Sequence, residues 1–564
     1  MVTADLVIHN AVVLTLDANN RRAGSVAVRD GKIVGIWTES RTPDDEVKIT
    51  FETNVIDANG ATLIPGFVDT HNHIYGYSQM LHFVNCSTPP NKTIQNILSN
   101  LQKKAEQTPA GEWIKGYGYD DTSIEEQRHL TREEIDRVVP DHPVNVSHIS
   151  GHLSVVNTAA LKLAGIDETV SDPPEGYFGR DANGYLNGLL FEKTAMSYIT
   201  KVQPEQTEDE MMEALVKATR HYLAEGITTN TEAALGMSGN PKKELNVFLK
   251  AASKGSNPLR MRLMLLHTVL QDTGMYAGYT AGEIDQEWNR ATNGKVRLDS
   301  AKMFQDGSLQ ALTGALREGY HCDPTVYGAL FEEQQALNAE VLDLHNRGFR
   351  IAIHGNGDKA IGSILEAYEN ALDNTPKANH QHRIEHVQTA TEADIQKMAK
   401  LDVAGSFFIN HVYYWGERHY KLFLGAERAK RISPLTEAAR NNVLITLHSD
   451  CPVTPISPMF SIWAAVNRVT DKGNVLGPDQ RIDVVTALKA MTIYGAQLNF
   501  DDDHTGSIEI GKDADFAMLD GDPTAVDPIK IKDIHVQATW IGGEVVYQKE
   551  GSLFQTEVSL PGDS

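Results

Sequence analysis

The stretch "PGFVDTHNHIYG", residues 65–76, ends an apolar run with two histidines, His71 and His73, that stand one residue apart. This spacing alone is a weak signal for a metal site, because the chain has 21 histidines and most are expected to be solvated or hydrogen-bonded. The role of the pair depends on the fold, and the fold depends on how many similar apolar runs follow it.

Eight short apolar runs are predicted to form parallel strands, with amphipathic helices between them. The runs cover residues 66–71, 226–232, 262–267, 296–304, 350–354, 383–387, 403–409 and 443–450. One helix is predicted to begin at a capping box of Thr207 and Glu210 and to end at Gly226. Eight strands alternating with helices close a (β/α)8 TIM-like barrel, so an α/β fold is predicted. The span of about 76–206 is then a long insertion after barrel strand 1.

Both ends of the chain alternate apolar and polar residues, which is typical of antiparallel strands with one buried face. Asp30-Gly31 and Gly542-Gly543 interrupt this alternation where tight hairpin turns need residues that tolerate positive φ. We therefore expect residues 1–62 and 505–550 to form one small β-sandwich domain. Residues 63–504 are expected to form the barrel, including its insertion.

Metal-ligating residue types stand at the C-terminal ends of the predicted strands. They are His71 and His73 on strand 1, Lys302 on strand 4, His354 on strand 5, His386 on strand 6 and Asp450 on strand 8. In a barrel these ends converge at one mouth, where the chemistry of such folds takes place. Imidazole and carboxylate groups suit Zn²⁺ and related divalent ions, so the joint pattern predicts a metal centre.

The composition of the 564-residue chain, with 41% hydrophobic and 22% charged residues, is typical of a soluble globular protein. A formal net charge of -24 argues against a nucleic-acid partner, because phosphate binding needs clustered Lys and Arg. The first twenty residues lack a secretory signal pattern, and no window reaches about 18 consecutive apolar residues. We expect a cytoplasmic protein without a membrane partner, and a homodimer because two-fold homo-oligomers are common.

Several motifs resemble those of a known family. "PGFVDTHNH", "IAIHGNGD", "RIEHVQ" and "LHSDCPVTP", with a lysine near the end of strand 4, resemble the amidohydrolase superfamily of metal-dependent hydrolases. "GEWIKGYGYDD", "SGHLSVVNTAAL", "DANGYLNGLLFE" and "AKMFQDGSLQ" are similar to its YtcJ-like branch, which includes N-substituted formamide deformylase. The resemblance extends from about residue 4 to residue 550.

The resemblance implies a role for each ligand at the strand ends. His71 and His73 would bind the more buried metal, with Asp450 as a ligand that also handles the proton. His354 and His386 would bind a second metal. Zn²⁺ is the expected metal, as one or two ions.

Lys302 is the least obvious member of the set, because a free ammonium repels a cation. In the superfamily the strand-4 lysine is often carboxylated by CO2, which converts it to a bridging anion, and the resemblance implies this for Lys302. The alternative for this residue is an unmodified surface or salt-bridged lysine. Glu192, which ends "NGLLFE", is the alternative bridging carboxylate.

A metal-activated hydroxide is expected to attack the carbonyl of a small-molecule substrate, while Asp450 passes a proton to the leaving nitrogen. The expected function is hydrolysis of a C–N bond other than a peptide bond, in an N-substituted amide, a formamide or a cyclic amide. The alternatives are a deaminase of a heterocycle or an ester hydrolase with the same metal centre. A non-catalytic regulatory relative is the third hypothesis.

Five residues are candidates for substrate contacts. His152 in "SGH" and Asp306-Gly307 in "FQDGS" match motif positions that lie near the pocket in the YtcJ-like branch. Trp113 and Tyr117 are candidates for an apolar pocket wall. The alternatives are turns and structural hydrogen bonds for the first group, and core packing for the two aromatic residues.

Overall fold

The computed structural model describes residues 2–43, 45–88, 90–121, 123–149, 152–174 and 176–552. The chain divides into two compact units. One unit comprises Met1–Tyr75 and Ala218–Ser564, and the other comprises Gly76–Lys217. Each unit has its own sheets and its own hydrophobic core, so the two are described separately.

Eight parallel strands form the central sheet of the first unit, in an order that follows the sequence. They are β10 (Phe67–Asn72), β17 (Ile227–Leu235), β18 (Arg260–Leu266), β19 (Val296–Phe304), β20 (Ile351–Gly355), β21 (Arg383–His386), β22 (Ala404–Phe407) and β23 (Ile445–Leu447). All nine residues of β17 are buried, as expected for a strand covered on both faces. Each of the eight predicted runs overlaps one of these strands, so the predicted α/β barrel is confirmed.

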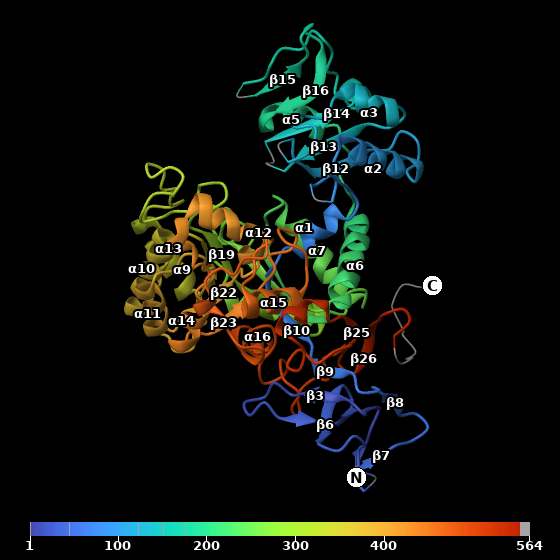
Figure 1. The fold of residues 1–564 in the computed structure, drawn as a ribbon, viewed down its shortest axis with the longest axis vertical. Helices are drawn as coiled ribbons and strands as arrows, with labels where there is room; N and C mark the ends of the chain where they lie inside the picture. Colours follow the sequence, from blue (N-terminus) through green and yellow to red (C-terminus); the bar gives the residue numbers. More distant parts are fainter. Residues whose placement is uncertain are drawn as a thin grey trace. The chain divides into compact units, whose positions relative to one another are not determined.

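Helices alternate with the barrel strands (Figure 1). They include α6 (Glu208–Ala224), α7 (Pro241–Ser253), α8 (Ala281–Thr292), α9 (Gln334–Asn346), α10 (Asp358–Asn374), α11 (Glu392–Leu401) and α14 (Leu435–Arg440). The predicted capping box of α6 is present, since the backbone N–H of Glu210 donates to the Thr207 hydroxyl over 3.2 Å and the Glu210 carboxylate accepts from the Thr207 N–H over 2.7 Å. The long insertion follows β10, as predicted.

Side chains close the seam between the first and last strands of the barrel. The ladder of hydrogen-bonded strands runs from β10 to β23. Across the remaining seam, the Thr70 hydroxyl oxygen lies 2.9 Å from that of Thr446 and 3.2 Å from that of Ser406. Just beyond, the backbone N–H of His73 donates to the Cys451 carbonyl over 2.8 Å. The seam therefore brings the end of β10 beside the loop that follows β23.

Both ends of the chain build the β-sandwich of the first unit, as predicted. One sheet has the order β6-β5-β2-β8 and the other the order β26-β25-β24-β9-β3-β4. Their bounds are β2 (Leu6–His9), β3 (Val12–Leu14), β4 (Arg22–Ala23), β5 (Ser25–Arg29), β6 (Lys32–Trp37), β8 (Asn54–Asp57), β9 (Thr62–Pro65), β24 (Phe516–Leu519), β25 (Val536–Ile541) and β26 (Glu544–Gln548). Asp30-Gly31 and Gly542-Gly543 adopt positive φ at the predicted hairpin turns. A shared core that includes Val13, Phe516 and Trp540 holds the sheets together.

The Gly76–Lys217 unit contains a six-stranded mixed sheet in the order β11-β12-β13-β14-β16-β15. The strands are β11 (Val84–Asn85), β12 (Ile114–Tyr119), β13 (Val144–His148), β14 (Leu153–Val156), β15 (Tyr177–Arg180) and β16 (Leu186–Phe191). The helices include α2 (Ile94–Glu106), α3 (Arg132–Val138), α4 (Thr158–Leu163) and α5 (Glu192–Thr200). Ile97 and Leu101 of α2 are fully buried in a core of this unit's own residues.

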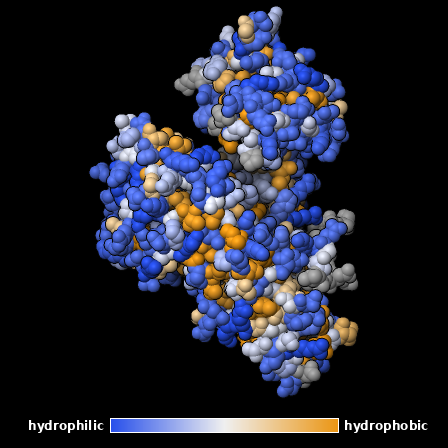
Figure 2. Space-filling view, in the orientation of Figure 1, coloured by the Kyte–Doolittle hydropathy of each residue, from blue (hydrophilic) through white to orange (hydrophobic). Residues whose placement is uncertain are grey.

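The surface is mostly hydrophilic on the face shown in Figure 2, and apolar residues gather near its centre, in the region where Figure 1 places α15 (Pro458–Asn467). Within the described parts of the chain, no helix combines the length and the apolar character needed to cross a bilayer.

Two buried histidines, His345 of α9 and His382 just before β21, form a chain of hydrogen bonds. His382 Nδ1 accepts the backbone N–H of Ile351 over 3.1 Å, so the ring proton of His382 is on Nε2, 2.8 Å from His345 Nδ1. His345 Nε2 lies 2.8 Å from the Thr375 carbonyl, which only accepts. His382 therefore donates to His345, and His345 donates to the Thr375 carbonyl. Burial lowers the pKa of His382 well below its ordinary value. Protonation of this ring would also break the chain of hydrogen bonds.

We expect His382 to make the protein acid-sensitive. Its pKa is lower in the folded than in the unfolded chain, so the native state binds fewer protons and stability falls as pH drops below about 6.5. One such histidine costs up to about 1.4 kcal/mol per pH unit. His382→Asn retains an acceptor near Nδ1 but cannot titrate. Urea unfolding between pH 7.5 and 5 should therefore show a shallower acid slope for this variant, and equal slopes for the two proteins would contradict the prediction.

Candidate metal centre

The barrel places the six predicted ligands at the C-terminal ends of its strands. His71 lies in β10 and His73 directly follows it, while Lys302, His354 and His386 lie in β19, β20 and β21. Asp450 stands three residues beyond the end of β23, at a positive φ of 53°. The turn that places Asp450 thus requires a backbone conformation that few residues other than Gly adopt readily.

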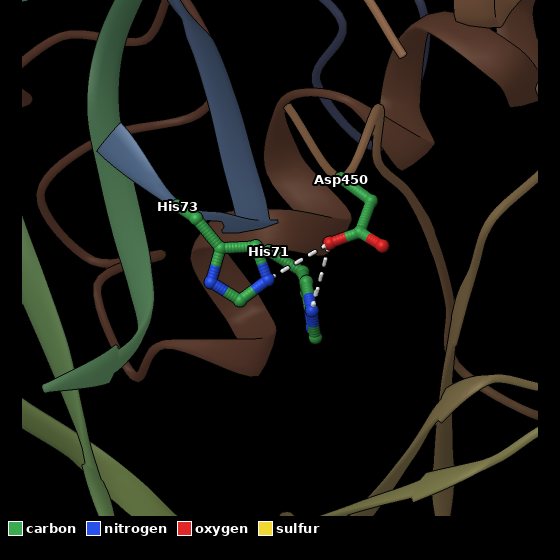
Figure 3. A group of neighbouring side chains, drawn as sticks. All are labelled: His71, His73 and Asp450. Atoms are coloured by element: carbon green, nitrogen blue, oxygen red, sulfur yellow. Dashed lines mark ion pairs between the residues drawn. The ribbon is translucent and has the colours of Figure 1, made fainter. Parts of the chain in front are cut away.

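Three of these side chains converge on one point. One carboxylate oxygen of Asp450, Oδ1, lies 3.1 Å from Nε2 of His73 and 3.3 Å from Nε2 of His71 (Figure 3). Ligand atoms of all three residues lie within 4.8 Å of one another, which is the separation expected of atoms that share one ion. Asp450 Oδ1 is buried and has no well-aligned hydrogen bond, although two imidazoles face it.

Glu385 determines which nitrogen of His71 faces Asp450. Its Oε2 atom forms a short hydrogen bond with His71 Nδ1, and its Oε1 atom accepts from Arg383 Nε over 2.5 Å. Since this carboxylate holds a proton at Nδ1 of His71, Nε2 is the nitrogen that faces Asp450 Oδ1 and can offer its lone pair to a cation. Two lone pairs at this distance repel each other unless a cation lies between them. A carboxylate behind a ligating imidazole is also the usual second layer of a metal site, so the donor set fits a divalent ion.

Electrostatics keep the carboxylate of this group ionised. Burial would raise the pKa of Asp450, but the imidazoles of His71 and His73 hold it well below its ordinary value. Burial would likewise lower the pKa of His73, but Asp450 and Glu232 raise it to about 9 in the metal-free protein. The carboxylates of Asp450 and Glu232 thus favour a positive charge at this position, which a bound cation can supply.

A second group of ligands extends from the first. The ring of His386 lies 4.9 Å from that of His71 and 4.5 Å from that of His354. Lys302 is fully buried, and its Nζ atom has no hydrogen-bond partner among the described residues. Burial lowers the pKa of Lys302 to about 8, and burial with the Lys302 charge lowers the pKa of His354 to about 3. The structure therefore places Lys302 in the barrel interior, where its amine is more readily neutral than on the surface.

Sequence reasoning missed three residues that surround this group: Glu385, Glu232 and His448. The ring of His448 is stacked 4.6 Å from that of His71, and its Nε2 atom lies 3.2 Å from His386 Nδ1. The Oε1 atom of Glu232, on β17, lies 3.7 Å from His73 Nδ1. Each of the three lies in a run predicted to be a strand. An acidic or imidazole side chain inside a predicted buried strand is the sequence signal that identifies such residues.

The predicted substrate contacts Asp306 and Gly307 lie in the loop after β19. Both carboxylate oxygens of Asp306 are occupied, since they accept backbone N–H groups of Ala315, Asn356 and Gly357 over 2.7–3.0 Å. The Gly307 carbonyl lies 3.1 Å from His354 Nε2. Asp306 therefore holds the loop beside His354, and its substrate contact stays a prediction.

The other predicted contacts belong to the Gly76–Lys217 unit. His152 Nδ1 lies 3.0 Å from a carboxylate oxygen of Glu192, and both side chains are exposed. Trp113 packs against a core of this unit, and Tyr117 is half-buried in β12. Their roles toward substrate, and that of Glu192 toward metal, stay predictions.

Comparison with known proteins identifies the family. Residues 54–547 match the model of the amidohydrolase family. The chain belongs to the amidohydrolase family. YtcJ of Bacillus subtilis is 29% identical over 548 residues, covering 96% of this chain and 99% of YtcJ. N-substituted formamide deformylase of Arthrobacter pascens is 30% identical over 562 residues, covering 97% of this chain and 99% of the deformylase. The resemblance predicted from the motifs is thus confirmed over nearly the whole chain.

A solved structure confirms the fold independently. The crystal structure of an uncharacterized metal-dependent hydrolase from Pyrococcus horikoshii matches with a TM-score of 0.73 and 22% identity. The match covers 93% of this chain and 99% of that chain. The two chains therefore share one fold over most of their lengths.

We predict that Glu385→Gln weakens binding of Zn²⁺ by about 10- to 100-fold, because the amide no longer draws the Nδ1 proton of His71 as strongly. The measurement is competition with a chromogenic chelator. The matched control is Glu369→Gln, which removes a half-buried carboxylate of α10 that pairs with Lys397 and Lys400 of α11. Equal affinities for both variants would contradict the role of Glu385.

Proposed function

We propose that the protein is a metal-dependent hydrolase that cleaves the C–N bond of an amide-type substrate. The observation that carries the proposal is the convergence of His71 Nε2, His73 Nε2 and Asp450 Oδ1, with His71 oriented from behind by Glu385. A divalent ion, with Zn²⁺ as the first candidate, would supply Lewis acidity that lowers the pKa of a water molecule toward 7. His354, His386 and a carboxylated Lys302 would hold a second ion.

Asp450 is the residue that moves the proton. As an ionised carboxylate it accepts a proton from the attacking water, whose oxygen forms the new bond to the carbonyl carbon. The C–N bond then breaks, and Asp450 delivers the same proton to the leaving nitrogen, which cannot depart as an amide anion. Water and amide are consumed, and a carboxylic acid and an amine are formed, so the atoms balance without any other reactant.

An N-substituted formamide or a related N-substituted amide is the proposed substrate class. The support is the similarity to N-substituted formamide deformylase, which extends over 97% of this chain at 30% identity. His152, Trp113 and Tyr117 of the insertion are proposed as substrate contacts. A heterocycle deaminase or an ester hydrolase is the second candidate, because the same three converging groups serve either reaction.

We expect Asp450→Asn to lower kcat by about 10²- to 10⁴-fold, because the amide cannot accept the proton. Turnover is measured on a panel of N-substituted formamides, N-acyl amines, lactams, esters and aminated heterocycles. The matched control, Asp471→Asn, alters a carboxylate paired with Lys472 on the surface and should leave kcat unchanged.

Three outcomes of this experiment would contradict parts of the proposal. Well under one metal ion per chain, in protein purified without chelator, would remove the basis of the enzyme hypothesis. Ammonia release from aminated heterocycles without amide cleavage would favour the deaminase. Undiminished amide turnover in Asp450→Asn would exclude Asp450 as the proton carrier.

We predict that Lys302→Ala loses metal and activity, because an essential bridging anion would be missing. Short carboxylic acids such as formate or acetate should restore part of both by entering the vacated space. Metal content is measured by elemental analysis, and Lys397→Ala on α11 is the control. Wild-type metal content in Lys302→Ala would transfer the bridging role to Glu192, which Glu192→Gln then tests.

A further inference from the structure

We infer that His411 donates a hydrogen bond from Nε2–H to the substrate oxygen, and that His419 positions it by fixing its tautomer. This inference deepens the proposed amide hydrolysis and rests on it for the nature of the substrate. Neither residue belongs to the predicted ligand set. Both are buried imidazoles on the segment that follows barrel strand β22.

His411 lies beside the ligands at the barrel mouth. It is the first residue of α12 (His411–Arg418), and its ring packs 4.6 Å from Phe408. The same Phe408 ring lies 5.8 Å from that of His386 and 5.4 Å from that of His448. The charge of Asp450 acts on His411 as well. Phe408 thus contacts both His411 and two of the rings at the candidate metal centre.

The ring of His411 is held in place from two further sides. Trp415, one turn along α12, lies 4.4 Å away between ring centroids. On another side, His411 Nδ1 lies 3.1 Å from Nε2 of His419. Only 3% of His411 is exposed, so its orientation is fixed by packing before any substrate arrives. A donor that is already oriented needs no reorganisation during the reaction.

The tautomer of His411 follows from the environment of His419. Burial lowers the pKa of His419 to about 3 and that of His411 well below its ordinary value, so both rings are neutral and share one proton across the 3.1 Å contact. His419 Nδ1 is buried and has no partner among the described residues.

If His411 donated across this contact, the proton of His419 would sit on that unpartnered Nδ1, and orphaned buried N–H groups are rare. If His419 donates instead, its Nδ1 carries only a lone pair. His411 Nδ1 is then the acceptor, and the ring proton of His411 resides on Nε2.

The Nε2–H group of His411 is available to a ligand. The hydrogen-bond contact that the ring of His411 makes among the described residues is through Nδ1, which leaves Nε2–H for a ligand. A neutral imidazole donor suits an oxygen that gains negative charge as water adds to the carbonyl, because the donor stabilises that charge without transferring its proton. Loss of one such donor typically lowers kcat by about 10²- to 10³-fold. The substrate would therefore carry an acceptor oxygen on the reacting carbon, as amides and formamides do.

The tautomer is tested first, without any substrate. Protein labelled with ¹⁵N in its histidine rings is compared with His411→Gln, which identifies the His411 signals by their absence. We expect a protonated Nε2 and an unprotonated Nδ1 for His411. His419→Leu should make the two tautomers exchange, while His419→Gln, which retains a donor near Nε2, should preserve the wild-type pattern. A protonated Nδ1 in the wild-type protein would overturn the inference.

The contact with substrate is tested on zinc-loaded protein. Acetohydroxamate, a carbonyl compound that binds zinc, should shift the Nε2–H proton signal of His411, and an unchanged signal would overturn the contact. In turnover, His411→Leu should lower kcat by about 10²- to 10³-fold with metal content and KM little changed, and His411→Gln should recover part of the loss. His535→Gln, on the exposed surface, is the control.

The outcomes separate the two proposals. Absence of amide turnover in the wild-type protein contradicts the proposed function, whereas the ¹⁵N pattern and the acetohydroxamate shift remain decisive for His411. Equal kcat values for His411→Leu and the wild-type protein, with amide turnover present, would overturn the inference alone.

Discussion

The carboxylate of Glu385 joins the ionic interior of the barrel to the candidate metal centre. One of its oxygens accepts from Arg383 and the other holds His71 Nδ1. Arg383 also donates to Asp299, 3.0 Å away, and Asp299 pairs with Arg350 at the same distance. Buried charges are tolerated only when paired in this way, because removing one partner leaves an uncompensated charge. The orientation of His71 is therefore fixed by the same ion pairs that fill the barrel interior.

The fold could be predicted from the sequence because its signals are local. Runs such as residues 350–354 are mostly apolar and of strand length, and β20 lies within one residue of these bounds. The hairpins at Asp30-Gly31 and Gly542-Gly543 need positive φ, which few residue pairs supply. The strand-end position of His71 followed from counting eight such runs. Periodicity and turn chemistry thus determine where each chemically reactive residue is placed along its strand.

The contacts around those residues could not be predicted in the same way. Glu385 and His71 are 314 positions apart in the chain, and nothing in either strand specifies the other as its partner. Asp306 illustrates the same limit, since its motif indicated a pocket while its carboxylate accepts three backbone N–H groups from two separate loops. Such contacts depend on the three-dimensional path of loops, where no periodic pattern exists.

The seam of the barrel has a consequence for how the protein is made. Thr70 and Thr446 join the first strand to the last, and the His73 N–H donates to the Cys451 carbonyl next to Asp450. In a growing chain His71 and His73 are made with the first barrel strand, whereas their partner Asp450 is made only after the last one. The three-residue site therefore cannot assemble on a nascent chain before the last barrel strand has been added. Metal loading at this point would report the completion of the barrel.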